Sequence, residues 1–173
     1  MTLHSVDIPV IETARLILRA GRETDLDALA AFYASDRAAY VGGPMDRVQS
    51  WLAIAAGLGH WLIRGYGMWT MEDRVTGLPC GRCGFIFREG WPEPELGWQV
   101  WDGFEGNGLA HEAVVAARDH GARYFGLDSV VSYIDPANLR SQRLAIRLGA
   151  VHDGDTTLLG GPVQAWRHPR VTA

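Results

Sequence analysis

Residues 101–121, WDGFEGNGLAHEAVVAARDHG, pass from three glycines directly into a segment rich in alanine and valine. Glycine weakens a helix, so glycines at a helix start indicate either a loop with positive φ or a close approach of another group to the backbone. The unpaired N–H groups and the positive dipole end of a helix start bind anions, and Gly106 and Gly108 would let a phosphate reach them. With the small Ala110 in the first turn, this stretch predicts a pyrophosphate cradle.

Two other kinds of site use similar residues and match this stretch less well. A dinucleotide fingerprint, G-x-G-x-x-G, would have His111 in place of its third glycine and Asp128 or Asp135 as its ribose acid. That motif belongs after the first strand of its fold, with several βα units beyond it. A zinc motif H-E-x-x-H lacks its second histidine because Val115 stands there, so we predict no metal site.

The composition limits the chain to a few classes of protein. Its 173 residues suffice for one ordinary domain, and 47% apolar with 21% charged residues is typical of a folded protein. The net charge is −4 and all 16 basic residues are arginines, which excludes a Schiff-base lysine and a Walker phosphate loop. The lack of a basic excess argues against nucleic acid as a partner, and the negative charge favours an amine-bearing one.

The sequence does not predict a membrane or secreted protein. Its longest apolar stretch, residues 51–63, is too short to span a bilayer and contains two glycines and His60. The first residues lack the pattern of a signal peptide, so we expect a cytoplasmic protein. Cys80 and Cys83 lie in a run with strand character, and we interpret them as incidental strand cysteines rather than a redox or zinc pair.

The pattern of apolar residues predicts one α/β domain around a mixed sheet. Helices are expected at about residues 26–33, 46–64, 110–125 and 138–148. Strands are expected at residues 14–20, 66–73, 80–87, 95–101 and 129–134, and in two short closing runs at 150–152 and 163–166. Turns with glycine and proline separate the second, third and fourth of these strands, which therefore form an antiparallel meander.

The cradle and the segment after it resemble the acetyl-CoA-binding core of the GNAT N-acetyltransferases, specifically the RimJ/RimL-type branch. The resemblance rests on GFEGNGLAHEA, residues 103–113, and GLDSVVSYIDPANLRSQRLAIRLGAV, residues 126–151. In this family the pattern Q/R-x-x-G-x-G/A binds the CoA pyrophosphate, and here Glu105 replaces the Gln/Arg. Further similar segments extend the resemblance, so we expect a single N-acetyltransferase domain over residues 1–173 with its core at about 12–170.

The resemblance implies a mixed, mostly antiparallel sheet that is flanked by helices and splays between the fourth and fifth predicted strands. Acetyl-CoA would lie in that split as a cosubstrate, and its pantetheine arm would pair with the strand of residues 95–101. A backbone N–H there would polarise the thioester carbonyl. The implied cofactor-binding residues are Val100, Gly106, Asn107, Gly108, Leu109, Ala110, Asn138 and Ser141.

The implied reaction is direct attack of a primary amine on the thioester in a ternary complex, and it needs a base. An alkylamine with a pKa of about 10 is protonated at neutral pH. Glu95 is the first candidate for the base, directly or through water, because it begins the strand near the split, and Glu93 is the second. Glu95 shares a strand face with Gly97 and Gln99, so we do not expect a core residue. The alternative is that both glutamates are solvated loop acids.

Ser141 shares a helix face with Leu144, Ala145 and Leu148, so its hydroxyl is expected to point inward, where it needs a partner. The resemblance implies that this hydroxyl hydrogen-bonds the CoA sulfur and assists its departure. The alternative is a bond to its own helix backbone. Asn138 is expected to cap the same helix, and the resemblance adds a contact with the pantetheine arm or the acceptor.

The acceptor amine is not defined by the sequence. Tyr40 and the tryptophans Trp61, Trp69, Trp91 and Trp98 could line an acceptor pocket, although aromatic residues are more often part of the core. The resemblance allows an amine-bearing small molecule or a protein N-terminus as acceptor, and it is compatible with a homodimer. A non-catalytic acyl-CoA-binding or partner-binding module on the same fold is the alternative to an enzyme.

Overall fold

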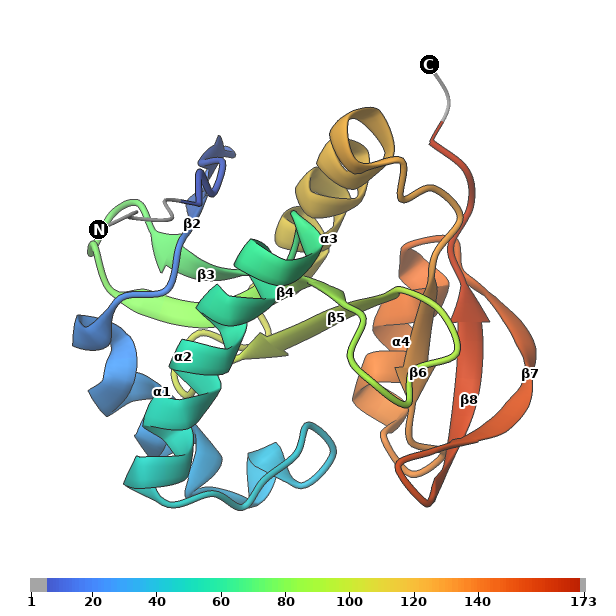
Figure 1. The fold of residues 1–173 in the computed structure, drawn as a ribbon, viewed down its shortest axis with the longest axis horizontal. Helices are drawn as coiled ribbons and strands as arrows, with labels where there is room; N and C mark the ends of the chain where they lie inside the picture. The colour runs from blue at the N-terminus through green and yellow to red at the C-terminus, as the bar shows by residue number, and fades with distance from the viewer. Residues whose placement is uncertain (1–5, 172–173) are drawn as a thin grey trace.

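The computed structural model describes residues 6–171, which form one mixed sheet of eight strands flanked by helices (Figure 1). The order across the sheet is β1-β2-β3-β4-β5-β6-β8-β7, and every neighbouring pair is antiparallel except β5 and β6. The strands are β1 (Ile11–Glu12), β2 (Leu16–Arg19), β3 (Met68–Asp73), β4 (Pro79–Ile86), β5 (Glu95–Val100), β6 (Val131–Ile134), β7 (Val151–Leu158) and β8 (Gly161–Arg167). The predicted α/β fold with a mixed, mostly antiparallel sheet is confirmed.

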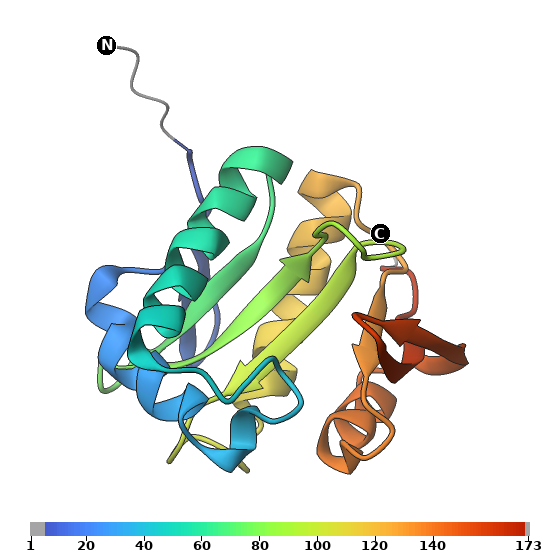
Figure 2. The same ribbon diagram turned by 60° about the horizontal axis from the view of Figure 1, so that its bottom comes forward.

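Helices cover both faces of the sheet. Helices α1 and α2 lie on one face of β3, β4 and β5, and α3 lies on the other, whereas α4 packs against β6 (Figure 2). The helical elements are α1 (Leu26–Tyr33), α2 (Arg47–Arg64), α3 (Leu109–His120) and α4 (Leu139–Arg147), with short turns η1 (Glu23–Asp25), η2 (Asp36–Ala38) and η3 (Gly121–Phe125). Within the described part of the chain, no helix combines the length and the apolar character needed to cross a membrane.

Local sequence signals set the helix ends. Asp46 accepts a hydrogen bond from the Gln49 backbone N–H at 2.8 Å and caps α2, which stops at Gly65 with a φ of 76°. Asn138 Oδ1 accepts from the Ser141 backbone N–H at 3.2 Å and caps α4, as predicted.

The main core lies between the sheet and α3. Leu16 and Leu18 of β2 are fully buried there. Trp61 and Trp69 also belong to this core, with their ring centroids 4.9 Å apart. Trp69 therefore packs the interior, whereas Trp61, which is also buried, borders a small pocket between α2 and the sheet.

The structure differs from the sequence prediction at the edges of the sheet. A short strand, β1, precedes the first predicted strand, so the fourth and fifth predicted strands are β5 and β6. The closing hairpin of β7 and β8 is much longer than expected. Residues 151–157 of β7 are exposed on both faces. An edge strand that is exposed on both faces needs no apolar alternation, so its sequence, VHDGDTT, carried no strand signal.

Gly121 permits close packing between η3 and β4. A Cβ atom at this position would lie 2.2 Å from Cζ of the buried Phe85 ring, and the φ of −60° adds no backbone conflict. We expect Gly121→Ala to lower the free energy of unfolding by about 1–3 kcal/mol through overpacking. Gly59→Ala in α2 is the control, since its Cβ would meet nothing within 4 Å, and it should raise stability by about 0.5–1 kcal/mol. Urea unfolding measures both, and equal stability of the two variants would contradict the packing argument.

Candidate active site

The sheet splits between β5 and β6. The two strands pair only at Glu95 and Val131, and their ribbons part beyond that point (Figure 1). A cleft of about 790 Å³ lies at the split. It is lined by the end of β5, the glycine loop, the start of α3, the inner side of α4, and residues of α1 and η2.

The edge of β5 that faces the split keeps free backbone groups. Trp101 donates its N–H to the Cys80 carbonyl at 2.8 Å, and Gly81 pairs with Val100 in register. Because hydrogen-bonded and non-bonded pairs alternate in an antiparallel ladder, the backbone groups of Trp98 and Val100 point away from β4 and toward the split. The Val100 carbonyl accepts from Arg37 Nη2 at 3.0 Å, which leaves its N–H toward the cleft.

The glycine loop has the open geometry of an anion cradle. Gly106 and Gly108 have φ angles of 79° and 77°, and Gly108 is the N-cap of α3 without a side-chain cap. A Cβ on Gly106 would meet nothing within 4 Å, and the nearest atom to one on Gly108 is Arg15 Nη2 at 3.6 Å. Both glycines line the cleft with Leu109 and Ala110, so the helix N–H groups are accessible from it.

Thr13 and Arg15, in the segment between β1 and β2, hold this loop and the start of α3. Glu112 accepts from Thr13 Oγ1 at 2.6 Å and from Arg15 Nε at 2.7 Å, while Arg15 Nη1 donates to the Asn107 carbonyl at 2.7 Å. Partial burial opposes ionisation, but the hydrogen bonds from Thr13 and Arg15 keep the pKa of Glu112 below its ordinary value. Asn107 contributes this anchored carbonyl and is not among the described residues that line the cleft.

Arg37 pairs with Glu105, the acid that stands where the resemblance implies Gln or Arg. Its guanidinium forms an ion pair with Glu105 and lies 3.1 Å from Asp102, while it also donates to the Val100 carbonyl. The side chain thus joins η2, the end of β5 and the glycine loop. Arg37 thus offsets part of the negative charge of Glu105 and Asp102, and Glu105 Oε2 is buried without a hydrogen-bond partner among the described residues.

Glu95 is buried at the closed end of the split, with 9% of its surface exposed. The prediction that it is not a core residue is wrong, because Trp91 and β6 close over the carboxylate. Trp91 Nε1 donates to it at 2.7 Å and the Tyr133 backbone N–H at 3.3 Å. Burial outweighs these bonds and raises the pKa of Glu95 above its ordinary value. Glu95 is not among the described residues that line the cleft.

Glu93, the second candidate base, lies in an ion pair. Arg167 holds both of its carboxylate oxygens, at 2.6 and 2.9 Å, and also donates to Asp153 at 2.9 Å. The hydrogen bonds that Arg167 donates to Glu93, against some burial, raise the pKa of Arg167. This pairing gives Glu93 a structural role on the hairpin side of the sheet.

Ser132 and His168 fasten the closed end of the split. The Ser132 hydroxyl donates to the Leu96 carbonyl across the two strands. His168 Nε2 lies 2.9 Å from Ser132 Oγ. Since the serine hydrogen is used, Nε2 must carry the hydrogen of a neutral imidazole. Burial, with a smaller effect of the Arg118 charge, lowers the pKa of His168 to about 4.

Helix α4 presents polar side chains to the open end of the cleft. Ser141 and Asn138 both line it. Among the described residues, Ser141 Oγ has no hydrogen-bond partner, so the alternative of a bond to its own helix backbone is not observed. Arg140, Arg143 and Arg147 follow one another along the same wall, and none of them pairs with a described carboxylate.

The cysteines of β4 are remote from this chemistry. Cys80 and Cys83 are free and fully buried. Burial raises the pKa of the Cys80 thiol to about 12 and also raises that of Cys83. Such thiols are poor nucleophiles, which supports their interpretation as packing residues.

The model of the acetyltransferase (GNAT) domain family matches residues 15–151. The chain belongs to the GNAT acetyltransferases. An Agrobacterium tumefaciens acetyltransferase of known crystal structure has 33% sequence identity with this GNAT protein. The two structures superpose with a TM-score of 0.87 over 98% of this chain and 99% of the other. RimL, a ribosomal L7/L12 alpha-N-protein acetyltransferase in complex with coenzyme A, shares the fold at 19% identity, with a TM-score of 0.77 over 94% and 98% of the two chains.

A curated relative covers only part of the GNAT protein. The uncharacterized Bacillus subtilis protein YkkB is 32% identical over 110 residues, which are 61% of this chain. The matched region spans 60% of the length of YkkB. The name of this relative states neither a family nor an acceptor.

Proposed function

We propose that this protein is an acetyl-CoA-dependent N-acetyltransferase of the RimJ/RimL type that transfers an acetyl group to a primary amine. One observation carries the proposal: the cleft at the β5–β6 split has an open glycine cradle at one end and free backbone groups of a strand edge along its side. The cradle suits a pyrophosphate. The strand edge suits the amide groups of a pantetheine arm.

The positive charges around the cleft match an anionic nucleotide. Arg140, Arg143 and Arg147 lie on the α4 wall. Arg37 offsets part of the charge of Glu105 in the glycine loop. The phosphates of acetyl-CoA would bind at the start of α3 and along α4, which directs the thioester toward the closed end of the split.

The proposed reaction proceeds in a ternary complex. The neutral amine attacks the thioester carbonyl carbon, a C–N bond forms, and the C–S bond breaks with both electrons going to sulfur. The Val100 N–H would stabilise the developing negative charge on the carbonyl oxygen. Ser141 Oγ would donate to the departing sulfur, and Glu95 would take the amine proton through water. The alternative, a non-catalytic acyl-CoA-binding module, predicts binding without thiol release.

Thermal unfolding followed by a thiol assay tests this proposal. Acetyl-CoA at about one hundred times its Kd should stabilise the native state by about 2.7 kcal/mol and raise the midpoint, whereas NADH should not. Release of CoA thiol in the presence of a primary amine would then establish turnover. The absence of a shift with acetyl-CoA, or a shift with NADH instead, would contradict the proposed site.

Ser141→Ala is expected to lower kcat about tenfold, the scale of one net hydrogen bond to the departing sulfur. The Kd of acetyl-CoA should remain unchanged, because the cradle is intact and the Asn138 cap uses the backbone N–H of residue 141, which alanine retains. Steady-state kinetics together with calorimetric titration of acetyl-CoA separate the two effects. A kcat equal to that of the wild type would rule out the assigned role.

A further inference from the structure

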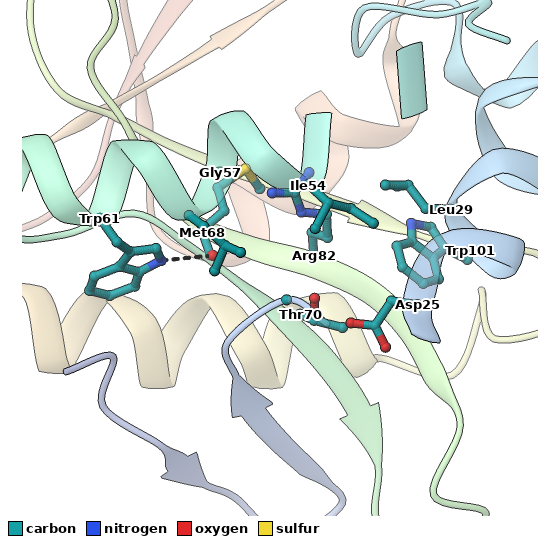
Figure 3. Close-up of a pocket in the computed structure, with 11 residues that line it drawn as sticks. Asp25, Leu29, Ile54, Gly57, Trp61, Met68, Thr70, Arg82 and Trp101 are labelled. Carbon is teal, nitrogen blue, oxygen red and sulfur yellow. Dashed lines mark hydrogen bonds between the residues drawn. The ribbon is translucent and has the colours of Figure 1, made fainter. Parts of the chain in front are cut away.

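The solvent-facing side of α2 is apolar along the length of the helix. Residues 48–63 contain no acidic residue, no arginine and no lysine. The inner side of the helix turns Ile54, Gly57 and Trp61 toward the sheet, where they border a small pocket (Figure 3). On the opposite side, five large apolar residues are between 46% and 78% exposed, namely Val48, Trp51, Leu52, Leu62 and Ile63. No described element of the fold covers them (Figure 2).

These exposed residues lie on one face of the helix, because they recur at spacings of three or four residues. The small residues Ala55, Ala56 and Gly59 occupy the middle of the same face. We call residues 48, 51, 52, 55, 56, 59, 62 and 63 the outer face of α2. A surface helix normally carries polar residues on this side. A contiguous exposed apolar surface that is bordered by polar residues therefore marks an interaction site.

The two ends of the outer face carry opposite charges. At the N-terminal end, Glu23 accepts from the indole of the outer-face tryptophan at 3.3 Å, and Asp46 caps the helix. At the C-terminal end, Arg64 donates to the Phe87 carbonyl at 3.1 Å, which places Arg88 nearby. No described residue of opposite charge lies within ion-pair distance of these two acids and two arginines. Both ends therefore have charges that a partner could compensate.

A second copy of α2 in antiparallel orientation matches this face in shape and in charge. With a two-fold axis between residues 55 and 56, Leu52 of one copy lies opposite Gly59 of the other, and Val48 lies opposite Ile63. Gly59 offers an open notch for the leucine, because a Cβ there would meet nothing within 4 Å. The same orientation brings the arginines at one helix end beside the carboxylates of the other copy, at both ends of the contact.

We propose that the outer face of α2 is a self-association surface, on which a second copy of this chain packs its own α2 in antiparallel orientation. The dimer does not depend on the proposed acetyl transfer. The 18 residues of α2 give a contact about 27 Å long and about 10 Å wide, at the lower end of specific interfaces. The dimer is therefore reversible, with a Kd on the order of 10 µM.

A bilayer is a less suitable occupant of the outer face. A helix that lies in a membrane interface carries arginine or lysine along its polar border. Here Glu23, Asp27 and Asp46 border one end of the face, and the chain has a net charge of −4, so an anionic bilayer would repel it. A second copy supplies the complementary charges at both ends.

Sedimentation velocity over a range of concentrations around this Kd tests the proposal. The wild type should shift from monomer to dimer as the concentration rises. Ala55→Glu places a carboxylate at the exposed centre of the outer face, beside its own copy across the two-fold axis, and should raise the dimer Kd by about 100-fold or more. The control, Ile146→Glu, makes the same change in charge at an exposed position of α4 and should dimerise as the wild type does. A wild type that stays monomeric, or a dimer that Ala55→Glu leaves intact, would overturn the proposal.

A charge-exchange experiment identifies the partner as a second copy. Ala55→Arg alone should be monomeric, whereas its equimolar mixture with Ala55→Glu should form a heterodimer, because residue 55 of each copy then faces an opposite charge. Both variants should keep the circular dichroism of the wild type, since position 55 is exposed and both new residues favour a helix. A mixture without dimer would contradict the antiparallel arrangement. Flotation of monomeric wild type with vesicles of phosphatidylcholine and phosphatidylglycerol would assign the outer face to a bilayer and overturn the proposal.

Discussion

Gly108→Val should weaken acetyl-CoA binding by about 10–150-fold, the loss of one charge-assisted hydrogen bond to a phosphate. Gly108 begins α3 with a φ of 77° and lines the cleft. A β-branched side chain there would cover the helix N–H groups and would also disfavour the left-handed backbone. Calorimetric titration of acetyl-CoA measures the loss of affinity.

Gly103→Val is the control for the backbone strain that a valine suffers at positive φ. Gly103 has a φ of 84°, its Cβ would meet nothing within 4 Å, and it is not among the described residues that line the cleft. Gly103→Val should lose stability to a similar degree as Gly108→Val, by about 1–2 kcal/mol, and should bind acetyl-CoA as the wild type does. Equal affinity in both variants would mean that the pyrophosphate binds elsewhere.

Glu95→Gln should lower kcat by about 10²–10⁴-fold, the usual contribution of a general base, with little change in the KM of acetyl-CoA. Glu95 must be deprotonated to accept the amine proton. Because burial raises its pKa, the acidic limb of the kcat profile should lie at higher pH than for an ordinary glutamate. This limb should disappear in Glu95→Gln. The matched control is Glu93→Gln, which only disturbs the ion pair with Arg167 and should keep most of the activity.

Stability provides an independent measurement of the same carboxylate. A raised pKa in the folded state means that the native protein holds this proton more tightly than the unfolded chain. The free energy of unfolding should therefore fall as pH rises from the ordinary glutamate pKa through the higher pKa of folded Glu95. Glu95→Gln should lack this fall. An identical pH dependence of urea unfolding in wild type and variant would show that Glu95 has an ordinary pKa.

Patterns within a few residues of each other were sufficient to predict much of the fold and part of the site. The glycines at residues 106 and 108, the Asn138 cap, and the inward face of Ser141 follow from backbone preferences and helix periodicity. The buried residues Leu16 and Leu18 follow from strand alternation. These features depend on short-range geometry, which the local sequence specifies directly.

Only the tertiary structure decided the contacts that set the electrostatics of the site. Glu105 is 68 residues from Arg37, and Arg15 is 97 residues from Glu112, so no local pattern could show that these charges pair. Glu95 is buried because Trp91 and β6 cover it, which depends on how the strands associate. The row of polar side chains from Arg19 through Thr70 and Arg82 to Gln99 exists only because four strands align in register, and Asp25, which pairs with Arg19, also lines the pocket beside Arg82. Local sequence thus determines where the chain turns and caps, whereas the three-dimensional packing determines which charges are compensated.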